Sequence, residues 1–168
     1  MTSTGGAKIK LVELDEASYR EYCEDLTCDY AHDKVRAGVW STAEAESRAA
    51  QELDELLPDG PATRDHFLYS VWDDSLPAEV GILWFAVRNS GVGRSLWIYD
   101  IIIHERFQRR GYARRTLELV EDEARELGAR RVELHVFGHN DGARTVYEQV
   151  GYGITSMVMA KPVHTEGG

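Results

Sequence analysis

The sequence has little of what disulfide bonding, export or membrane insertion requires. Its two cysteines, Cys23 and Cys28, match no metal-binding or redox spacing, and its 168 residues exclude a stapled miniprotein. No apolar stretch approaches the ~18 residues of a membrane span, and the opening residues MTSTGGAKIK lack the apolar segment of a signal peptide. These absences predict a reduced, cytoplasmic protein with no membrane partner.

Basic residues are also few. There are 19 Lys and Arg against 29 Asp and Glu, and residues 13–59 alone contain 14 acidic and 4 basic residues. Nucleic-acid binding depends on a broad basic surface, so no nucleic-acid partner is expected. Internal repeats and low-complexity segments are absent, and we expect one domain over residues 1–168, with loose ends at 1–6 and 164–168.

Hydrophobic periodicity predicts the element order β, α, α, β, β, β, α, β, α, β, an α/β (α+β) fold. Residues 96–103 are too uniformly apolar for a strand with one wet face, so this strand is expected inside a sheet covered on both sides. A crossover helix makes it a parallel neighbour of the strand at 131–137, with the ligand site at their carboxyl ends. The expected strands are 8–13, 66–72, 79–87, 96–103, 131–137 and 152–162, and the expected helices are 19–30, 41–57, 111–127 and 141–150.

The stretch FQRRGYARR, residues 107–115, places four arginines around Gly111 at the expected start of a helix. A first helical turn leaves backbone N–H groups unbonded and carries a partial positive charge, and a glycine lets an anion approach them. Arg109, Arg110 and Arg114 add attraction for phosphate. Taken alone, the pattern is equally typical of a solvated arginine cluster, and it is neither a nucleotide P-loop nor a dinucleotide glycine motif.

The wider context resembles the coenzyme-A-binding core of the GNAT N-acetyltransferase superfamily. The residues concerned are IIIHERFQRRGYA, a helix, and then VELHVFGHNDGARTVYEQVGY. The family's loop of Gln or Arg, two residues, Gly, one residue and Gly or Ala falls on Gln108, Gly111 and Ala113, and its Asn and Tyr fall on Asn140 and Tyr147. The second motif closes with Gly and an aromatic residue, as the family's does.

This resemblance covers about residues 79–161 and is greatest to small bacterial members without an assigned substrate. It implies a three-layer fold in which a mixed sheet of about six to seven strands is flanked by about four helices, with the parallel strands splayed at the cofactor. Residues 79–161 would form the coenzyme-A-binding core. Residues 9–60 match the family only in element order and would supply the helices on the acceptor side.

The resemblance also implies acetyl-CoA as cosubstrate, without a metal. The backbone of Ile101, Ile102 and Ile103 would lie along the pantetheine arm, where one amide polarises the thioester carbonyl. Asn140 would hydrogen-bond that arm, cap the helix that follows it, or do both. The pyrophosphate would be held by backbone amides of Gln108, Arg109, Arg110, Gly111, Tyr112, Ala113 and Arg114.

Acetyl transfer to an amine also needs an acid and a base. Tyr147 holds the family position that protonates the departing thiolate, or else it is one more member of an apolar helix stripe. Asp100 is one candidate base, because a carboxylate in an apolar strand is costly unless it is paired or faces a wet cleft. His135 is the other, because its pKa suits proton transfer. Structural roles stay open for both, and His104 and His139 are further candidates to line the cleft.

Three functions therefore remain open. They are acetylation of a small amine, acetylation of a protein N-terminus or lysine, and non-catalytic acyl-CoA sensing. The acidic residues between 13 and 59, together with Tyr30 and Trp40, predict a cationic acceptor held by charge and cation–π contact. The alternative is a solvated acidic helix face. Oligomeric state, including a homodimer, is left open by the sequence.

Overall fold

The computed structural model describes residues 8–163, which form four α-helices, two 3₁₀ turns and one five-stranded sheet. The strands are β1 (Ile9–Glu13), β2 (His66–Asp73), β3 (Ala78–Ser90), β4 (Gly93–Ile103) and β5 (Val132–Leu134). The helices are α1 (Glu16–Arg36), α2 (Ala45–Leu56), α3 (Tyr112–Glu126) and α4 (Asp141–Val150). The ends expected to be loose, 1–6 and 164–168, lie outside the described residues.

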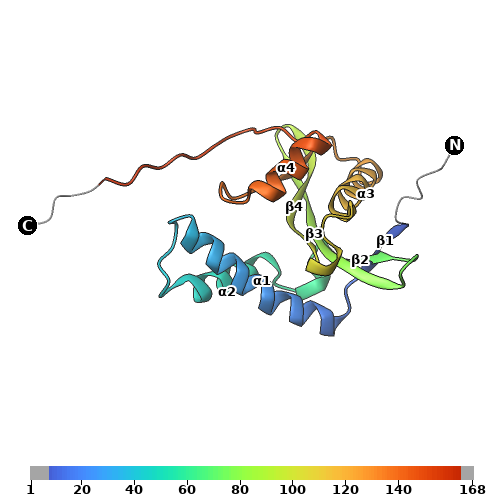
Figure 1. Cartoon of the computed structure of the whole chain (residues 1–168), viewed down its shortest axis with the longest axis horizontal. Coiled ribbons are helices and arrows are strands. Elements are labelled where there is room, and N and C mark those ends of the chain that lie inside the picture. The colour runs from blue at the N-terminus through green and yellow to red at the C-terminus, as the bar shows by residue number, and fades with distance from the viewer. Residues whose placement is uncertain (1–7, 164–168) are drawn as a thin grey trace, which may run out of the picture.

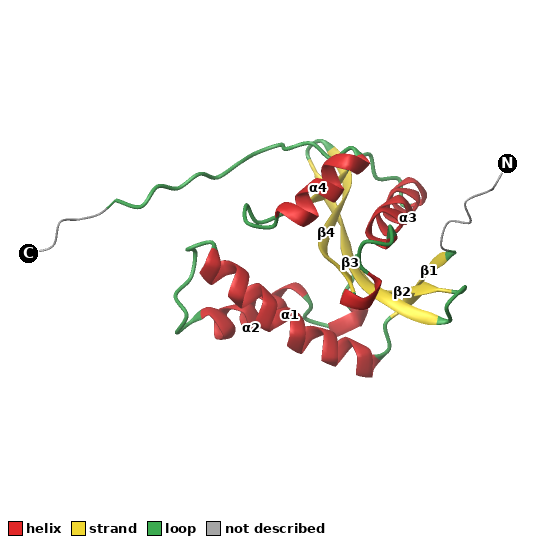
Figure 2. Ribbon diagram, in the orientation of Figure 1, coloured by secondary structure: helices red, strands yellow, loops and turns green. Residues whose placement is uncertain are grey.

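Strand order in the sheet follows chain order, β1-β2-β3-β4-β5. Neighbours are antiparallel except for β4 and β5, which are parallel as predicted. Helices cover both faces of the sheet (Figure 1), giving three layers. On one face α3 and α4 pack against a core that includes Phe85 and Leu117, and on the other α1 and α2 pack around Tyr22 and Trp84. The strand predicted at 96–103 is covered on both faces as expected, but only residues 96–98 have a strand neighbour on each side. Figure 2 shows β3 and β4 running between the helix pairs.

Helix α3 follows the predicted pattern closely. Leu117, Val120 and Ala124 repeat at helical spacing and are buried against the sheet. Gly128, just beyond the helix, has a left-handed φ of 68°, which a glycine adopts without strain. Helix α2 begins at Ala45 instead of Ser41. Residues 41–44 form a turn in which the backbone N–H of Ser41 donates to the side-chain carboxylate of Glu44.

The predicted number of strands, six to seven, is wrong. Residues 152–162 were expected to form a strand but pair with nothing in the described chain, and the strand expected at 131–137 is shortened to Val132–Leu134. Both segments have side chains that favour extended backbone, yet a strand also needs a neighbour. Pairing of β5 with β4 stops after Ile98, and no strand of residues 8–163 lies on the other edge of β5.

Gly81 allows β3 to approach β4 closely. A Cβ atom at this position would overlap the carbonyl oxygen of Ile102 on the neighbouring strand. Gly81→Ala should therefore force the strands apart and lower the free energy of unfolding by about 1 to 3 kcal/mol, measured by urea denaturation. Gly142→Ala in α4 is the control, because its Cβ would meet open space. Equal stability of Gly81→Ala and wild type would contradict this account.

Candidate functional site

Strands β4 and β5 run side by side for only three residue pairs. These are Leu96 with Val132, Trp97 with Glu133, and Ile98 with Leu134. Beyond this point β4 remains paired with β3 as far as Ile103, whereas the chain after β5 leaves the sheet. Within residues 8–163, the β5-facing edge of 99–103 therefore has no strand partner, and its backbone groups are available to an extended ligand.

A β-bulge lies at the same point of β4. Trp84 of β3 pairs with Asp100, and the next residue, Phe85, pairs with Ile98. Tyr99 is therefore the extra residue on β4. A bulge of this kind redirects the side chains that follow it.

The bulge decides which way the strand's carboxylate points. Before it, Leu96 and Ile98 pack on the α3 side of the sheet, and after it Ile101 and Ile103 do so. Strict alternation would have placed Asp100 on that apolar side as well. The bulge instead turns the carboxylate toward α1.

Asp100 is partly buried and accepts a hydrogen bond from the buried Tyr22 of α1, with 3.0 Å between Oη and Oδ2. Burial raises the pKa of Asp100 to about 6, and the charges of Asp29 and Asp33 act in the same direction. The hydrogen bonds from Tyr22 and from the backbone N–H of Ile101 oppose this shift. A carboxyl group with this pKa can bind and release a proton close to neutral pH.

Tyr147 of α4 packs beside Tyr152, with 5.8 Å between ring centroids, against the core on the α3 side. Burial and the negative charge of Asp100 raise the pKa of Tyr147 to about 12. The two residues therefore lie within electrostatic reach of each other. No hydrogen bond joins them among the described residues, and their side chains pack on opposite sides of the sheet, Asp100 toward α1 and Tyr147 on the α3 side.

The third residue predicted to transfer protons, His135, lies just beyond β5 and is exposed. Its ring meets Phe137 edge-on at 5.0 Å, and burial of part of the ring, together with Lys34 on α1, lowers the pKa of His135. No hydrogen bond joins it to Asp100 or Tyr147 in the described part of the chain. It thus lies near Lys34, in the carboxyl-terminal half of α1.

Two further histidines end up in different places. His139 Nε2 lies 2.7 Å from Oδ1 of Asp33, which ties the loop before α4 to α1, and its ring stacks on Phe137. His139 therefore borders the site. His104 pairs with Glu79 of β3 at 2.9 Å.

The loop between β4 and α3 has the backbone geometry of an anion site. Arg109 and Gly111 take left-handed φ values of 59° and 82°, and Gly111 is the N-cap of α3 without any side-chain cap. Among the described residues, no hydrogen bond is made by the backbone N–H groups of 109–114. Nothing lies within 4 Å of where a Cβ of Gly111 would stand. Unbonded amides beside open space fit a phosphate group.

Side chains fix this loop to the sheet. Tyr112 donates to the buried carboxylate of Asp73 at the end of β2, at 2.6 Å. Hydrogen bonds from Ser75 and Tyr112 lower the pKa of Asp73, so it accepts in its charged form. The amide of Gln108 donates to the carbonyl of Ile103 at 3.0 Å. The start of α3 is held against the carboxyl end of β4.

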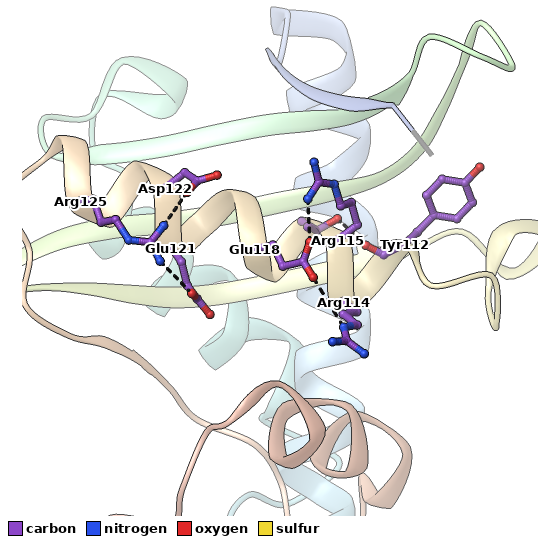
Figure 3. A network of polar contacts seen from close by, with 8 residues as sticks. Tyr112, Arg114, Arg115, Glu118, Glu121, Asp122 and Arg125 are labelled. Atoms are coloured by element: carbon purple, nitrogen blue, oxygen red, sulfur yellow. Dashed lines mark hydrogen bonds and ion pairs between the residues drawn. The ribbon is translucent and has the colours of Figure 1, made fainter. Parts of the chain in front are cut away.

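The arginine side chains are partly engaged elsewhere. Figure 3 shows Arg114 and Arg115 directed toward Glu118, with N–O distances of 3.5 and 2.7 Å. Arg110 lies over the ring of Phe107, 5.9 Å from its centroid. These three side chains are therefore less available to an anion than the unbonded backbone amides of the loop.

Comparison with known proteins identifies the family. Residues 24–152 match the acetyltransferase (GNAT) family. The chain is also 35% identical over 153 residues to the uncharacterized N-acetyltransferase YycN of Bacillus subtilis strain 168, covering 91% of this chain and 97% of that protein. The chain belongs to the GNAT acetyltransferase family. The resemblance seen in its motifs is thus confirmed.

Further matches agree with this assignment. The B. subtilis N-acetyltransferase YdgE, also uncharacterized, is 28% identical over 151 residues, 90% of this chain and 96% of that protein. The crystal structure of B. subtilis YycN aligns with a TM-score of 0.88 at 34% identity, covering 94% of this chain and 100% of that one. This GNAT protein is an N-acetyltransferase, and its family implies an acyl-CoA cosubstrate and an amine acceptor. Within residues 8–163 no helix has both the length and the apolar character needed to cross a bilayer.

Asn140 caps α4 of the acetyltransferase. Its Oδ1 accepts the backbone N–H of Ala143 at 3.2 Å. The capping role is confirmed, and the side-chain NH₂ group remains a possible donor to a ligand.

The predicted acceptor-side aromatics pack on each other and on cations of the chain itself. The rings of Tyr30 and Trp40 are 5.5 Å apart, and Lys34 Nζ lies 5.0 and 4.9 Å from their centroids. Trp40 is buried and is also covered by Arg48. Tyr30 additionally contacts Phe137 at 6.5 Å, beside the end of β5. Tyr30 thus lies near the chain that follows β5, and Trp40 has a packing position.

A hollow of about 410 Å³ lies elsewhere, between α1 and α2. Burial raises the pKa of its one half-buried thiol, that of Cys23, which leaves this thiol less reactive. This hollow does not border the ends of β4 and β5. Its lining residues are Cys23, Glu24, Thr27, Cys28, Glu46, Ala50, Leu53 and Asp54.

Proposed function

We propose that this N-acetyltransferase transfers the acetyl group of acetyl-CoA to a primary amine that carries positive charge. One observation supports the proposal most: β4 and β5 separate after Ile98, where Asp100 lies within electrostatic reach of Tyr147, directly before the unbonded amides of α3. The candidates for base, acid and phosphate site thus lie toward one end of the sheet.

The residues present fit acetyl-CoA, which supplies an activated acyl carbon and a thiolate leaving group. Backbone amides of residues 108–114 would hold the pyrophosphate. The unpaired edge of Ile101–Ile103 would bind the pantetheine arm, and one of its N–H groups would polarise the thioester carbonyl. Asn140 would donate to the same arm from its free NH₂ group.

Two side chains would move the protons. Asp100 accepts the proton that the amine loses as the new N–C bond forms, and Tyr147 gives its proton to sulfur as the C–S bond breaks. The two titrations are coupled, because the negative charge of Asp100 raises the pKa of Tyr147. Once Asp100 is protonated, that charge is gone and Tyr147 becomes a stronger acid as the thiolate forms. His135 is the alternative base.

Negative charge surrounds the place where the amine must arrive. Asp29 and Asp33 lie close enough to raise the pKa of Asp100. Such a field concentrates cations, whereas the ring of Tyr30 at the same border already contacts Lys34 of the chain itself. Helices within residues 9–60 would thus form the acceptor wall.

A thiol-release screen with acetyl-CoA tests the proposal. Polyamines, aminoglycosides, neutral amines, anionic amines and basic peptides should be compared at low and high ionic strength. We expect turnover of cationic amines with a KM that rises with salt, because salt screens the attraction. Turnover of neutral or anionic amines alone, without salt dependence, would contradict the cationic acceptor, and turnover of peptides alone would favour protein acetylation.

Tyr147→Phe should lower kcat by about 10²-fold or more while leaving coenzyme A affinity nearly unchanged, because the hydroxyl acts on the leaving group. Tyr152→Phe is a matched control, since its buried hydroxyl has no hydrogen-bond partner within residues 8–163 and its ring lies beside Tyr147. This control should keep full turnover. Single-turnover kinetics measure the effect, and an unchanged chemical step in Tyr147→Phe would assign that tyrosine to packing alone.

A further inference from the structure

Asp73 places a fully buried carboxylate at the end of β2. Its Oδ1 accepts from the backbone N–H and the hydroxyl of Ser75, at 2.7 and 2.5 Å, and its Oδ2 accepts from the hydroxyl of Tyr112 at 2.6 Å. Hydrogen bonds from Ser75 and Tyr112 lower the pKa of Asp73, so the group is charged at neutral pH. Burying a charge is costly even when hydrogen bonds compensate for it. A carboxylate kept at this position indicates a role that a neutral side chain would not fill.

Tyr112 joins this carboxylate to the candidate pyrophosphate site. It is the first residue of α3 and directly follows Gly111. Its ring is buried, extends away from the arginines of the helix (Figure 3) and meets the ring of Phe107 edge-on at 6.0 Å. Its backbone N–H is one of those that make no hydrogen bond among the described residues. One residue thus offers an amide to an anion and a hydroxyl to Asp73.

The hydrogen bond between Tyr112 and Asp73 is of the strong kind. A hydroxyl that donates to a carboxylate forms a bond of about 2.5 to 2.7 Å, shorter and stronger than that of a neutral pair. The 2.6 Å between Tyr112 Oη and Asp73 Oδ2 lies in this range, and the bond joins positions 39 apart in the chain. Because β3 lies between β2 and β4 in the sheet, the start of α3 is tied to a strand beyond the neighbour of β4.

We propose that Asp73 and Tyr112 are positioning residues for the cofactor, whose hydrogen bond holds the first residue of α3 so that the free amides beside it face the pyrophosphate of coenzyme A. The inference rests on the proposed function, which assigns the pyrophosphate to these amides. Coupling between two sites is reciprocal, so whatever the bond adds to cofactor binding, a bound cofactor adds to the bond. Coenzyme A should therefore stabilise the turn between β2 and β3 through Tyr112.

Tyr112→Phe removes only the hydroxyl and keeps the buried ring. Calorimetry should show the dissociation constant of coenzyme A raised about tenfold, as expected when one hydrogen bond to a charged group is lost. The KM for acetyl-CoA should rise with it, whereas kcat at saturating acetyl-CoA should stay within about twofold, because the hydroxyl bonds Asp73 and not the thioester.

Val120→Ala is the matched control, because this side chain is also fully buried in α3 but lies two turns beyond the loop. It should lower stability and leave the affinity for coenzyme A unchanged. If Val120→Ala weakened binding as much as Tyr112→Phe does, the hydroxyl would serve stability alone.

Asp73→Asn separates positioning from simple electrostatics. The variant still accepts from Ser75 through Oδ1 but turns an NH₂ group toward Tyr112, so that a charge-assisted bond becomes a neutral one. The substitution also removes a negative charge from behind the anion site, which by itself would tighten coenzyme A binding. Positioning predicts the opposite, a dissociation constant raised about threefold or more. Tighter binding would overturn the proposal.

Hydrogen exchange tests the coupling itself. The backbone N–H of Ser75 donates to the carboxylate of Asp73, and that of Leu76 donates to its carbonyl at 3.3 Å. Saturating coenzyme A should slow the exchange of both amides in wild type but not in Tyr112→Phe, and unchanged exchange in wild type would refute the coupling. A wild type that binds no coenzyme A would contradict the proposed function as well. Tight binding that Tyr112→Phe leaves unaffected would contradict this inference alone.

Discussion

Asp100→Asn should remove most acetyl transfer and, at neutral pH, make the protein more stable. The amide keeps the shape of the carboxylate and can still accept the hydrogen bond from Tyr22, but it cannot take a proton from the amine. Loss of a general base lowers kcat by about 10²- to 10⁴-fold. The reduction should appear in the chemical step, with coenzyme A affinity retained.

The gain in stability follows from the direction of the pKa shift. The pKa of Asp100 is raised from 3.8 to about 6 in the folded protein, chiefly by burial. Between these two values the folded state binds more protons than the unfolded state, so this residue's contribution to stability is lost as pH rises through the folded pKa. Asp100→Asn removes the burial cost of the charge and should raise the free energy of unfolding at pH 7 by about 1 to 3 kcal/mol.

Chemical denaturation checks the predicted gain in stability, and a pH–rate profile checks the role of Asp100 as the base. Wild type should lose kcat/KM as the pH falls below about 6, and the residual activity of Asp100→Asn should lack this limb. Asp29→Asn is the matched control: it removes a nearby charge that raises the pKa of Asp100, so it should keep kcat, raise the KM of a cationic acceptor and move the limb to lower pH. If Asp100→Asn kept the limb, the base would be His135 and His135→Gln should remove it.

Most helices and strands could be predicted because their apolar side chains repeat at short range. The stripe of Leu117, Val120 and Ala124 defines α3 without knowledge of its neighbours. The segment at 152–162 shows the limit of this reasoning. Its pattern favours a strand, but a strand depends on a partner that no local pattern names, and the described chain offers none. For the same reason the sequence predicted a longer β5 than the structure contains.

The site was predictable in part for the same reason. The anion loop is local, so Gln108 and Gly111 could be identified from one stretch of sequence. The contact between Tyr22 and Asp100 spans 78 positions and could not be read from spacing. The bulge could have been suspected from the sequence. In a strand whose side chains alternate without interruption, Asp100 would lie on the same apolar face as Leu96 and Ile98. A carboxylate at a position where alternation predicts an apolar side chain indicates either a buried charge or a bulge.

Gly111→Asp should weaken coenzyme A binding roughly 100- to 1,000-fold, whereas Gly111→Asn should weaken it only a few-fold. The two side chains have nearly the same size, and both tolerate the left-handed φ of 82° at this position. Nothing within 4 Å obstructs a Cβ. They therefore differ mainly in charge, and the carboxylate would lie beside the amides that receive the pyrophosphate.

The stability of the two variants distinguishes a direct loss of coenzyme A binding from misfolding. Asp at the N-cap of α3 can bond the free N–H groups and interacts favourably with the helix dipole, so Gly111→Asp should be at least as stable as Gly111→Asn. Binding and stability should thus change in opposite directions between the two variants. Calorimetry with coenzyme A measures the affinities, and added salt should narrow the difference because it screens the repulsion. If Gly111→Asp bound coenzyme A as tightly as wild type, the pyrophosphate would not sit at the start of α3, and the amides of residues 109–114 would need another ligand.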